Sequence, residues 1–174
     1  EMDIITPKSV VAFEFSNDEE LLRKLQKFYT IDGYTPNIRI EGDIIHVHVD
    51  DTIYKATQSD FQKAMAYCNS GNFDKAYPIL QGIIKKCTLH TDAFRVLGQI
   101  EMERGSYGKA EDFVLSALTI DPTNLWALVL MGNIYAYQGK IDVADTYYHR
   151  VLEYHPDDIL ALNNIAGNYL KEDD

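Results

Sequence analysis

The chain has 174 residues, of which 46% are hydrophobic and 25% charged, a composition typical of globular proteins and outside the range of disordered chains. It carries 16 Lys and Arg against 27 Asp and Glu, a formal net charge of −11, and both the segment 1–56 and the remainder are acidic. Nucleic acid and anionic membrane surfaces attract basic proteins, so neither is expected as a partner.

No apolar run approaches the ~18 to 20 residues of a membrane-spanning helix. The N-terminal residues lack the basic stretch and apolar core of a signal peptide, although an internal fragment of a longer protein would look the same. Cys68 and Cys87 fit a reducing compartment and are interpreted as core residues rather than as reactive thiols. These features predict a cytoplasmic protein.

The N-terminal segment, residues 1–56, mixes strand and helix patterns. Residues 9–16, SVVAFEFS, alternate with period two and predict a strand. Ser16 or Asn17 is expected to cap the helix that follows, which has acidic residues in its first turn and a leucine-rich stripe. Residues 37–51 return to period two around a Gly-centred turn and predict a hairpin. Residues 1–56 therefore form a predicted small α+β module of order β-α-β-β, which needs a neighbour because so short a chain buries little core.

Two histidines in this hairpin are weak candidates for a metal site. His46 and His48 occupy alternate positions on a strand, so both rings point to the same face. Zinc accepts imidazole ligands, and Asp50 and Asp51 follow, but no third ligand is tied to the pair by local spacing. A solvated strand face is the favoured interpretation, and no metal or other cofactor is predicted.

From residue 57 onward the apolar period becomes helical. Glycine, proline and asparagine divide the remaining chain into candidate helices, at residues 58–70, 74–87, 91–104, 108–120, 125–138, 142–154 and 159–171. Pro78 lies within the second of them and predicts a late helix start or a slight kink, because proline removes one backbone donor.

The helical part repeats itself at a fixed interval, the spacing from Gly71 to Gly105 and from Gly105 to Gly139. Small residues, turn glycines, an aromatic series and a closing proline fall in register when the chain is shifted by this interval, as in Ala64, Gly98, Gly132 and Ala166; Gly71, Gly105 and Gly139; Ala76, Ala110 and Ala144; and Pro122 and Pro156. Small residues are expected where two antiparallel helices cross, because larger side chains would separate the backbones. The glycines are expected to supply a positive φ at the end of a helix.

These offsets resemble the tetratricopeptide repeat family, whose unit is a helix-turn-helix of about 34 residues. The stretches VLGQIEMERGSYGKAEDFVLSALTIDP and LMGNIYAYQGKIDVADTYYHRVLEYHP carry the resemblance, whereas residues 1–56 are not covered by it. It implies a mostly α fold, a tetratricopeptide-type α-solenoid preceded by the α+β module. Residues 57–174 would form three repeats and a further C-terminal helix, which either caps the stack or begins a truncated fourth repeat. On that helix Leu162, Ile165, Ala166 and Tyr169 are expected to face the preceding repeat, leaving Asn163, Asn164, Asn168 and Lys171 more exposed.

The resemblance also implies a binding groove lined by the first helix of each repeat. The positions that the family uses there give the candidate partner-binding residues Phe61, Met65, Arg95, Gln99, Met102, Trp126, Val129, Asn133 and Asn163. The Lys and Asn clamp that grips a C-terminal carboxylate in one subgroup is not expected, because Phe61 and Met65 stand where it needs Lys and Asn. The tyrosines Tyr135, Tyr137, Tyr147, Tyr148 and Tyr154 are interpreted as core and groove walls.

No catalytic motif is present, so the chain is not predicted to be an enzyme. The leading hypothesis is a scaffold that binds a partner protein or peptide in the groove. The alternative is a regulatory or targeting segment of a larger enzyme whose catalytic part lies outside this chain. A third hypothesis is self-association into a homo-oligomer through an exposed edge of the N-terminal sheet.

Overall fold

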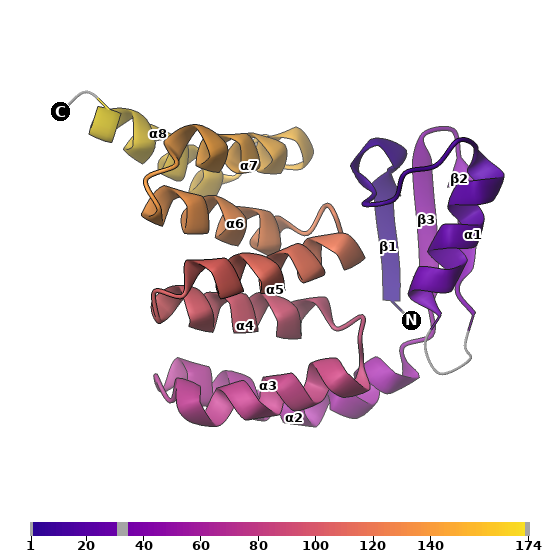
Figure 1. Cartoon of the computed structure of the whole chain (residues 1–174), viewed down its shortest axis with the longest axis horizontal. Helices are drawn as coiled ribbons and strands as arrows, with labels where there is room; N and C mark the ends of the chain where they lie inside the picture. Colours follow the sequence, from indigo (N-terminus) through magenta and orange to yellow (C-terminus); the bar gives the residue numbers. More distant parts are fainter. Residues whose placement is uncertain (1, 31–34, 173–174) are drawn as a thin grey trace. The chain divides into compact units, whose positions relative to one another are not determined.

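The computed structural model describes residues 2–30 and 35–172 and is mostly helical. Its elements follow in the order β1 (Met2–Pro7), α1 (Asp18–Tyr29), β2 (Asn37–Glu41), β3 (Ile44–Val49), α2 (Thr52–Asn69), α3 (Phe73–Lys86), α4 (Thr91–Glu103), α5 (Tyr107–Ile120), α6 (Leu125–Tyr137), α7 (Ile141–Tyr154) and α8 (Ile159–Glu172) (Figure 1). They form two compact units. Unit 1 comprises Glu1–Ala93 and Thr119–Pro122, and unit 2 comprises Phe94–Leu118 and Thr123–Asp174.

The strands of unit 1 form an antiparallel sheet in the order β1-β3-β2. Because side chains alternate across a strand, Ile45, Val47 and Val49 of β3 are buried on one face, and His46 and His48 lie on the other. Gly42 has a φ of 60° in the turn between β2 and β3, a conformation that favours glycine. The predicted hairpin is therefore confirmed.

The first strand is β1, and the prediction of a strand at residues 9–16 is wrong. Pro7, the last residue of β1, has no N–H, and the chain turns into a short 3-10 helix at Lys8–Val10 instead of continuing the strand. Beyond that turn Phe13 packs edge-on against Phe28 of α1, with ring centroids 5.2 Å apart. Phe13 of the alternating segment therefore packs on the helix. The order β-α-β-β is confirmed, with its first strand closer to the N-terminus.

Helix α1 is fixed at both of its ends. Asn17 is the N-cap, since its Oδ1 accepts a hydrogen bond from the Glu20 N–H at 2.9 Å, and the Glu20 carboxylate accepts one from the Ser16 N–H at 3.0 Å. At the other end the side chain of Tyr29 is buried, and its hydroxyl donates to the carbonyl of Ile120, which belongs to the same unit. Burial raises the pKa of Tyr29 well above its ordinary value.

Helices α2 to α8 correspond to the predicted helices, and most of their boundaries agree within a residue. The turn glycines Gly71, Gly105 and Gly139 have φ values of 72°, 73° and 75°, as their place at the ends of α2, α4 and α6 predicted. None of the helices in the described part of the chain is long and apolar enough to span a membrane.

Two helix starts differ from the sequence prediction. Helix α2 begins at Thr52, well before the expected start at residue 58. At this observed start the Asp50 carboxylate accepts a hydrogen bond from the Thr52 N–H at 2.8 Å. Helix α3 begins at Phe73 with Pro78 inside it, so of the two alternatives predicted from this proline, a late start or a slight kink, the late start is wrong. The helix tolerates the missing N–H because its buried stripe, which includes Leu80 and Ile83, is packed.

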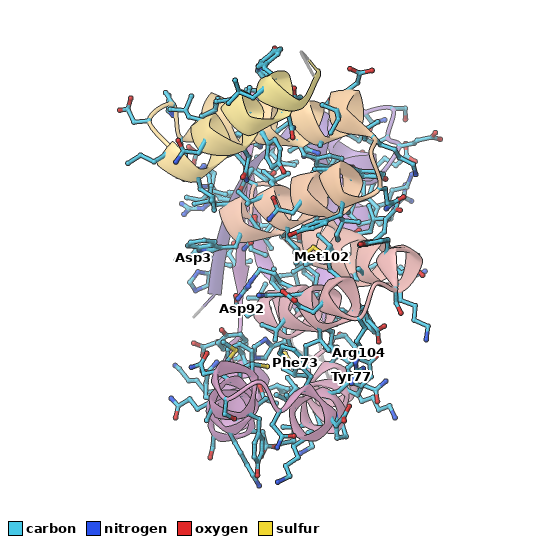
Figure 2. The ribbon with its side chains drawn as sticks, turned by 90° about the vertical axis from the view of Figure 1, so that its left-hand side faces the viewer. Asp3, Phe73, Tyr77, Asp92, Met102 and Arg104 are labelled. Carbon is cyan, nitrogen blue, oxygen red and sulfur yellow. The ribbon has the colours of Figure 1, made fainter. Side chains whose placement is uncertain are left out.

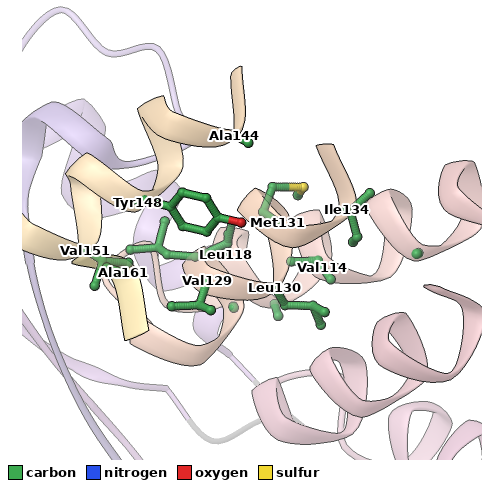
Figure 3. Packing of buried hydrophobic residues seen from close by; sticks show 14 residues of the cluster. Val114, Leu118, Val129, Leu130, Met131, Ile134, Ala144, Tyr148, Val151 and Ala161 are labelled. Carbon is green, nitrogen blue, oxygen red and sulfur yellow. The ribbon is translucent and has the colours of Figure 1, made fainter. Parts of the chain in front are cut away.

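The core of unit 2 is a cluster of buried apolar side chains from α5, α6, α7 and α8 (Figure 3). Helix α6 is apolar on nearly every side and lies at the centre of this cluster. At its crossing with α7, a Cβ atom added to Gly132 would lie 2.3 Å from Cε1 of Tyr148, and at the crossing of α4 with α5 one added to Gly98 would lie 2.6 Å from Val114. The predicted steric role of the small residues is confirmed at both crossings.

The expected orientation of α8 is wrong in part. Ile165 faces the core and Asn163 is exposed, as predicted, but Leu162, Ala166 and Tyr169 are exposed and Asn168 is buried, contrary to the prediction. The side chains turned toward α6 and α7 include Ala161, which is fully buried, and Asn168, which is 4% exposed, together with the half-buried Ile165. Leu162 and Tyr169 are 46% and 57% exposed. Tyr135, one repeat before Tyr169, stacks on Tyr147 of the second helix α7 with ring centroids 5.6 Å apart. The described part of the chain contains no such helix after α8.

Candidate functional site

The candidate groove residues of unit 1 are Phe61 and Met65, both half-buried on α2. The ring of Phe61 packs against His90, with centroids 4.9 Å apart, and Tyr54 packs against the same imidazole at 4.4 Å. His90 is fully buried, and its Nδ1 accepts a hydrogen bond from the Ala93 N–H at 3.1 Å, in the first turn of α4. Phe61, a candidate groove residue, therefore also packs internally against His90.

The other candidate groove residues lie in unit 2 and differ in their exposure. Gln99, Trp126 and Asn163 are exposed, with 58% of Trp126 accessible, while Arg95 and Met102 are half-buried (Figure 2 marks Met102 on α4). Val129 is only 4% exposed and belongs to the core cluster, so its side chain offers little surface to a partner.

Asn133 is held in one orientation by its neighbours on α7 and α8. Its Oδ1 accepts hydrogen bonds from the Tyr148 hydroxyl at 2.8 Å and from Nδ2 of Asn164 at 3.2 Å. None of the hydrogen bonds in the described part of the chain uses the Nδ2 group of Asn133. Asn133 is half-buried, and none of its side-chain atoms is among the described atoms that are buried without a hydrogen-bond partner. Its two amide hydrogens are therefore available to an acceptor on a partner.

The tyrosines of unit 2 have two different roles. Tyr148 is 1% exposed, and burial raises its pKa to about 12. Tyr135 donates a hydrogen bond to the Glu111 carboxylate at 2.5 Å, and this bond raises its pKa to about 12 because deprotonation would place two negative charges together. Tyr137 is 69% exposed, so it is not a core residue.

His46 and His48 lie on the outer face of the sheet, beside a hollow of about 320 Å³. Nδ1 of His48 contacts the Asp3 carboxylate on β1, and Nε2 of His46 lies 3.9 Å from the Glu41 carboxylate. Within residues 2–30 and 35–172, no group of three or more His, Cys, Asp or Glu side chains is arranged to hold a metal ion.

Sequence reasoning missed a small pocket in unit 2. It has a volume of about 200 Å³, and its lining comes from the end of α4, the following turn, the start of α5 and the end of α6, namely Met102, Glu103, Gly105, Tyr107 and Tyr137. The signal for it was present, because Tyr137 stands one repeat after Glu103 in the sequence. Equivalent positions of stacked repeats have similar surroundings, and both Glu103 and Tyr137 are exposed.

These observations define a repeat protein built from antiparallel helix pairs, with a small residue at each crossing and exposed side chains on the first helices. Tetratricopeptide repeat models match residues 61–124 and 126–158, more than half of the chain. The chain belongs to the tetratricopeptide repeat family, whose domains are typical protein–protein interaction modules. Residues 1–60 lie outside these matches.

The similar proteins include a member of a protein complex, a peptide-bound domain and an enzyme. BBSome complex member BBS4 of Bos taurus is 33% identical over 78 residues, which are 45% of this chain and 15% of that protein. The first tetratricopeptide domain of Spaghetti (RPAP3), bound to the HSP90 peptide SRMEEVD, has a TM-score of 0.65 at 17% identity and covers 69% of this chain and 98% of that one. The O-GlcNAc transferase of Thermobaculum terrenum has a TM-score of 0.63 at 20% identity over 69% and 23% of the two chains.

Proposed function

We propose that unit 2 is a protein-interaction module that binds a peptide or helix of a partner along its first helices, α4, α6 and α8. The exposure of Trp126 carries this proposal. Its indole is 58% exposed at the start of α6, where a side chain of this size would otherwise be largely buried. Leu160 holds the same repeat position on α8 and is 42% exposed. Exposed apolar anchors of this kind are the energetic centres of many peptide interfaces.

Polar side chains on the same helices supply hydrogen bonds to the proposed partner. Gln99 and Asn133 hold the same repeat position on α4 and α6. Because the oxygen of Asn133 is occupied by Tyr148 and Asn164, its Nδ2 group donates outward, and a backbone carbonyl of an extended peptide or a helix end is a suitable acceptor. A pre-oriented amide loses little conformational freedom on binding.

The proposed partner differs from the peptide that the Spaghetti (RPAP3) domain binds. That peptide, SRMEEVD, is acidic. In this chain the positions where a carboxylate clamp needs basic residues or amides hold Phe61, Met65, Trp126 and Leu130 instead. Repulsion from a chain of net charge −11 also disfavours an acidic ligand. We therefore propose a partner held by apolar anchors rather than by its C-terminal carboxylate.

The experiment begins with partner proteins captured by the full chain from its native cell and identified by cross-linking. Affinity is then measured for Trp126→Ala and for Asn133→Asp, which keeps the acceptor for Tyr148 and Asn164 but removes the outward donors. Val143→Ala, which also removes apolar surface but at a 41% exposed position on the second helix α7, is the control. We expect a loss of roughly tenfold or more for Trp126→Ala, a smaller loss for Asn133→Asp and none for the control. Full affinity in Trp126→Ala would overturn the proposal.

A second candidate is the regulatory or targeting segment of a larger enzyme. One observation favours it: the same fold occurs as a part of the O-GlcNAc transferase, of which this chain covers 23%. The full open reading frame discriminates between the two proposals. A coding sequence without a catalytic domain would remove this second candidate.

A further inference from the structure

The pocket lined by Met102, Glu103, Tyr107 and Tyr137 has the composition of a cation-binding site. The rings of Tyr107 and Tyr137 stack with centroids 6.4 Å apart and planes inclined by 13°. Beside them lie the thioether of Met102 and the exposed carboxylate of Glu103. Aromatic faces attract cations through their negative quadrupole, and a carboxylate adds a full opposite charge.

Other tyrosines of the chain already carry a cation of their own. Lys75 lies 5.6 Å from the ring centre of Tyr67, Lys140 lies 5.3 Å from that of Tyr135, and Arg150 lies 5.7 Å from that of Tyr147. Tyr107 and Tyr137 differ in this respect, because no Lys or Arg of the described residues lies over either ring.

The carboxylate of the pocket is also unused. Among the ion pairs of residues 2–30 and 35–172, none includes Glu103. Its neighbour Glu101, in contrast, is paired with Arg104 at 3.7 Å. Tyr137 and Glu103, two exposed groups that attract positive charge, therefore lie in one pocket, and no Lys or Arg of the described residues occupies it.

We propose that this pocket receives the side chain of a lysine or arginine from the partner peptide. The alkyl stem lies on Met102, whose flexible thioether adapts to an irregular surface, and the charged head lies at the face of Tyr137 within reach of Glu103. A planar group between two rings needs about 3.5 Å on each side. The separation of 6.4 Å is too small for insertion, so the cation lies against the exposed face of Tyr137.

This inference rests on the proposed function and adds the charge of the partner to it. Met102 connects the two, because it is both a candidate groove residue and a wall of the pocket. The net charge of −11 attracts a basic partner during the encounter. A basic residue in the pocket then fixes the register of a peptide whose apolar residues contact the first helices.

The test uses a defined probe, the capped peptide acetyl-Gly-Ser-Arg-Ser-Gly-amide, and the same peptide with citrulline, a neutral isostere, in place of arginine. Binding is followed by NMR on the ring resonances of Tyr107 and Tyr137 and on the Met102 methyl group. We expect the arginine peptide to shift these signals and to bind at least ~3-fold more tightly than the citrulline peptide, and its binding to weaken with salt. Equal binding of the two peptides overturns the inference.

Variants separate the pocket from the groove. Tyr137→Leu and Glu103→Gln should each weaken the arginine peptide by ~3-fold or more, whereas Tyr137→Phe, which keeps the ring, should not. Tyr169→Leu, at a 57% exposed tyrosine on α8, is the matched control. If the captured partner loses affinity in Trp126→Ala but not in Tyr137→Leu, the proposed function stands and the cation pocket is refuted. If the arginine peptide binds the pocket while the captured partner keeps its full affinity for Trp126→Ala, the proposed function is refuted and the cation pocket is not.

Discussion

The ring of Tyr148 occupies the space that a methyl group on Gly132 would need, since an added Cβ would lie 2.3 Å from its Cε1 atom. No real Cβ contact is so short, and the ring cannot retreat because Tyr148 is 1% exposed within the core of unit 2 (Figure 3). The crossing of α6 and α7 therefore depends on glycine at this position.

Gly132→Ala should destabilise the protein by about 1–3 kcal/mol through overpacking, even though alanine favours a helix. Gly167→Ala is the matched control on α8, where an added Cβ meets nothing within 4 Å. The control should be stabilising by roughly 0.5–1 kcal/mol, because only the helix propensity changes. Urea denaturation of both variants checks the pair, and similar changes of the same sign would contradict the packing argument.

Helix α8 offers a second matched pair of substitutions. Ile165 packs against the core cluster of unit 2, whereas Leu162, about one turn earlier on the helix, is 46% exposed. Ile165→Ala should cost about 1–3 kcal/mol, and Leu162→Ala should stay within about 0.5 kcal/mol. Thermal unfolding of the two variants measures the difference. A larger loss for Leu162→Ala would mean that its side chain is covered by a further helix or a second copy in solution.

The sequence was most informative where one residue type has a single steric role. Gly98, Gly132 and the glycines of the turns were assigned correctly, because a close helix crossing and a positive φ both exclude larger residues. Most helix boundaries followed from the glycine, proline and asparagine residues that divide the helical part of the chain.

Prediction from the sequence failed where the outcome depends on which neighbour is present. Each first helix of a repeat has two faces that can be buried, and the repeat pattern does not show that, within the described residues, α8 packs on only one of them. Residues 9–16 alternate like a strand, but Pro7 ends the ladder before they begin. The pocket beside Tyr137 is formed by two consecutive repeats, so neither repeat alone reveals it.

The buried imidazole of His90 predicts a loss of stability in mild acid. Burial lowers its pKa, although the nearby Asp92 opposes this, and Tyr54 and Phe61 enclose the ring. The unfolded chain takes up the proton first as the pH falls below its ordinary value of 6.5, so the folded state is destabilised there. Protonation of Nδ1 would also remove the acceptor for the Ala93 N–H.

Urea denaturation at pH 7.5 and 5.5 tests this prediction. The wild-type protein should lose stability between these values, and His90→Asn should lose less, since asparagine caps the helix without titrating in this range. His90→Asn should also be less stable than the wild type at pH 7.5, because the packing on Phe61 is lost. His155→Asn, at an exposed position, is the control. An unchanged pH dependence in His90→Asn would show that other groups are responsible.

The buried hydroxyl of Tyr148 predicts a loss of stability in alkali. Its pKa is raised to about 12, mainly by burial, so the unfolded chain releases this proton first once the pH exceeds about 10. The contribution to stability is therefore complete below pH 10 and declines between about 10 and 12. Tyr148→Phe should cost about 0.5–1.5 kcal/mol at pH 7, because the hydrogen bond to Asn133 is lost, but its stability should decline less steeply from pH 9 to 11.5. Tyr169→Phe, at a 57% exposed tyrosine on α8, should follow the wild-type curve. Chemical denaturation at fixed pH values gives the slopes, and equal slopes for Tyr148→Phe and the wild type would be incompatible with the raised pKa.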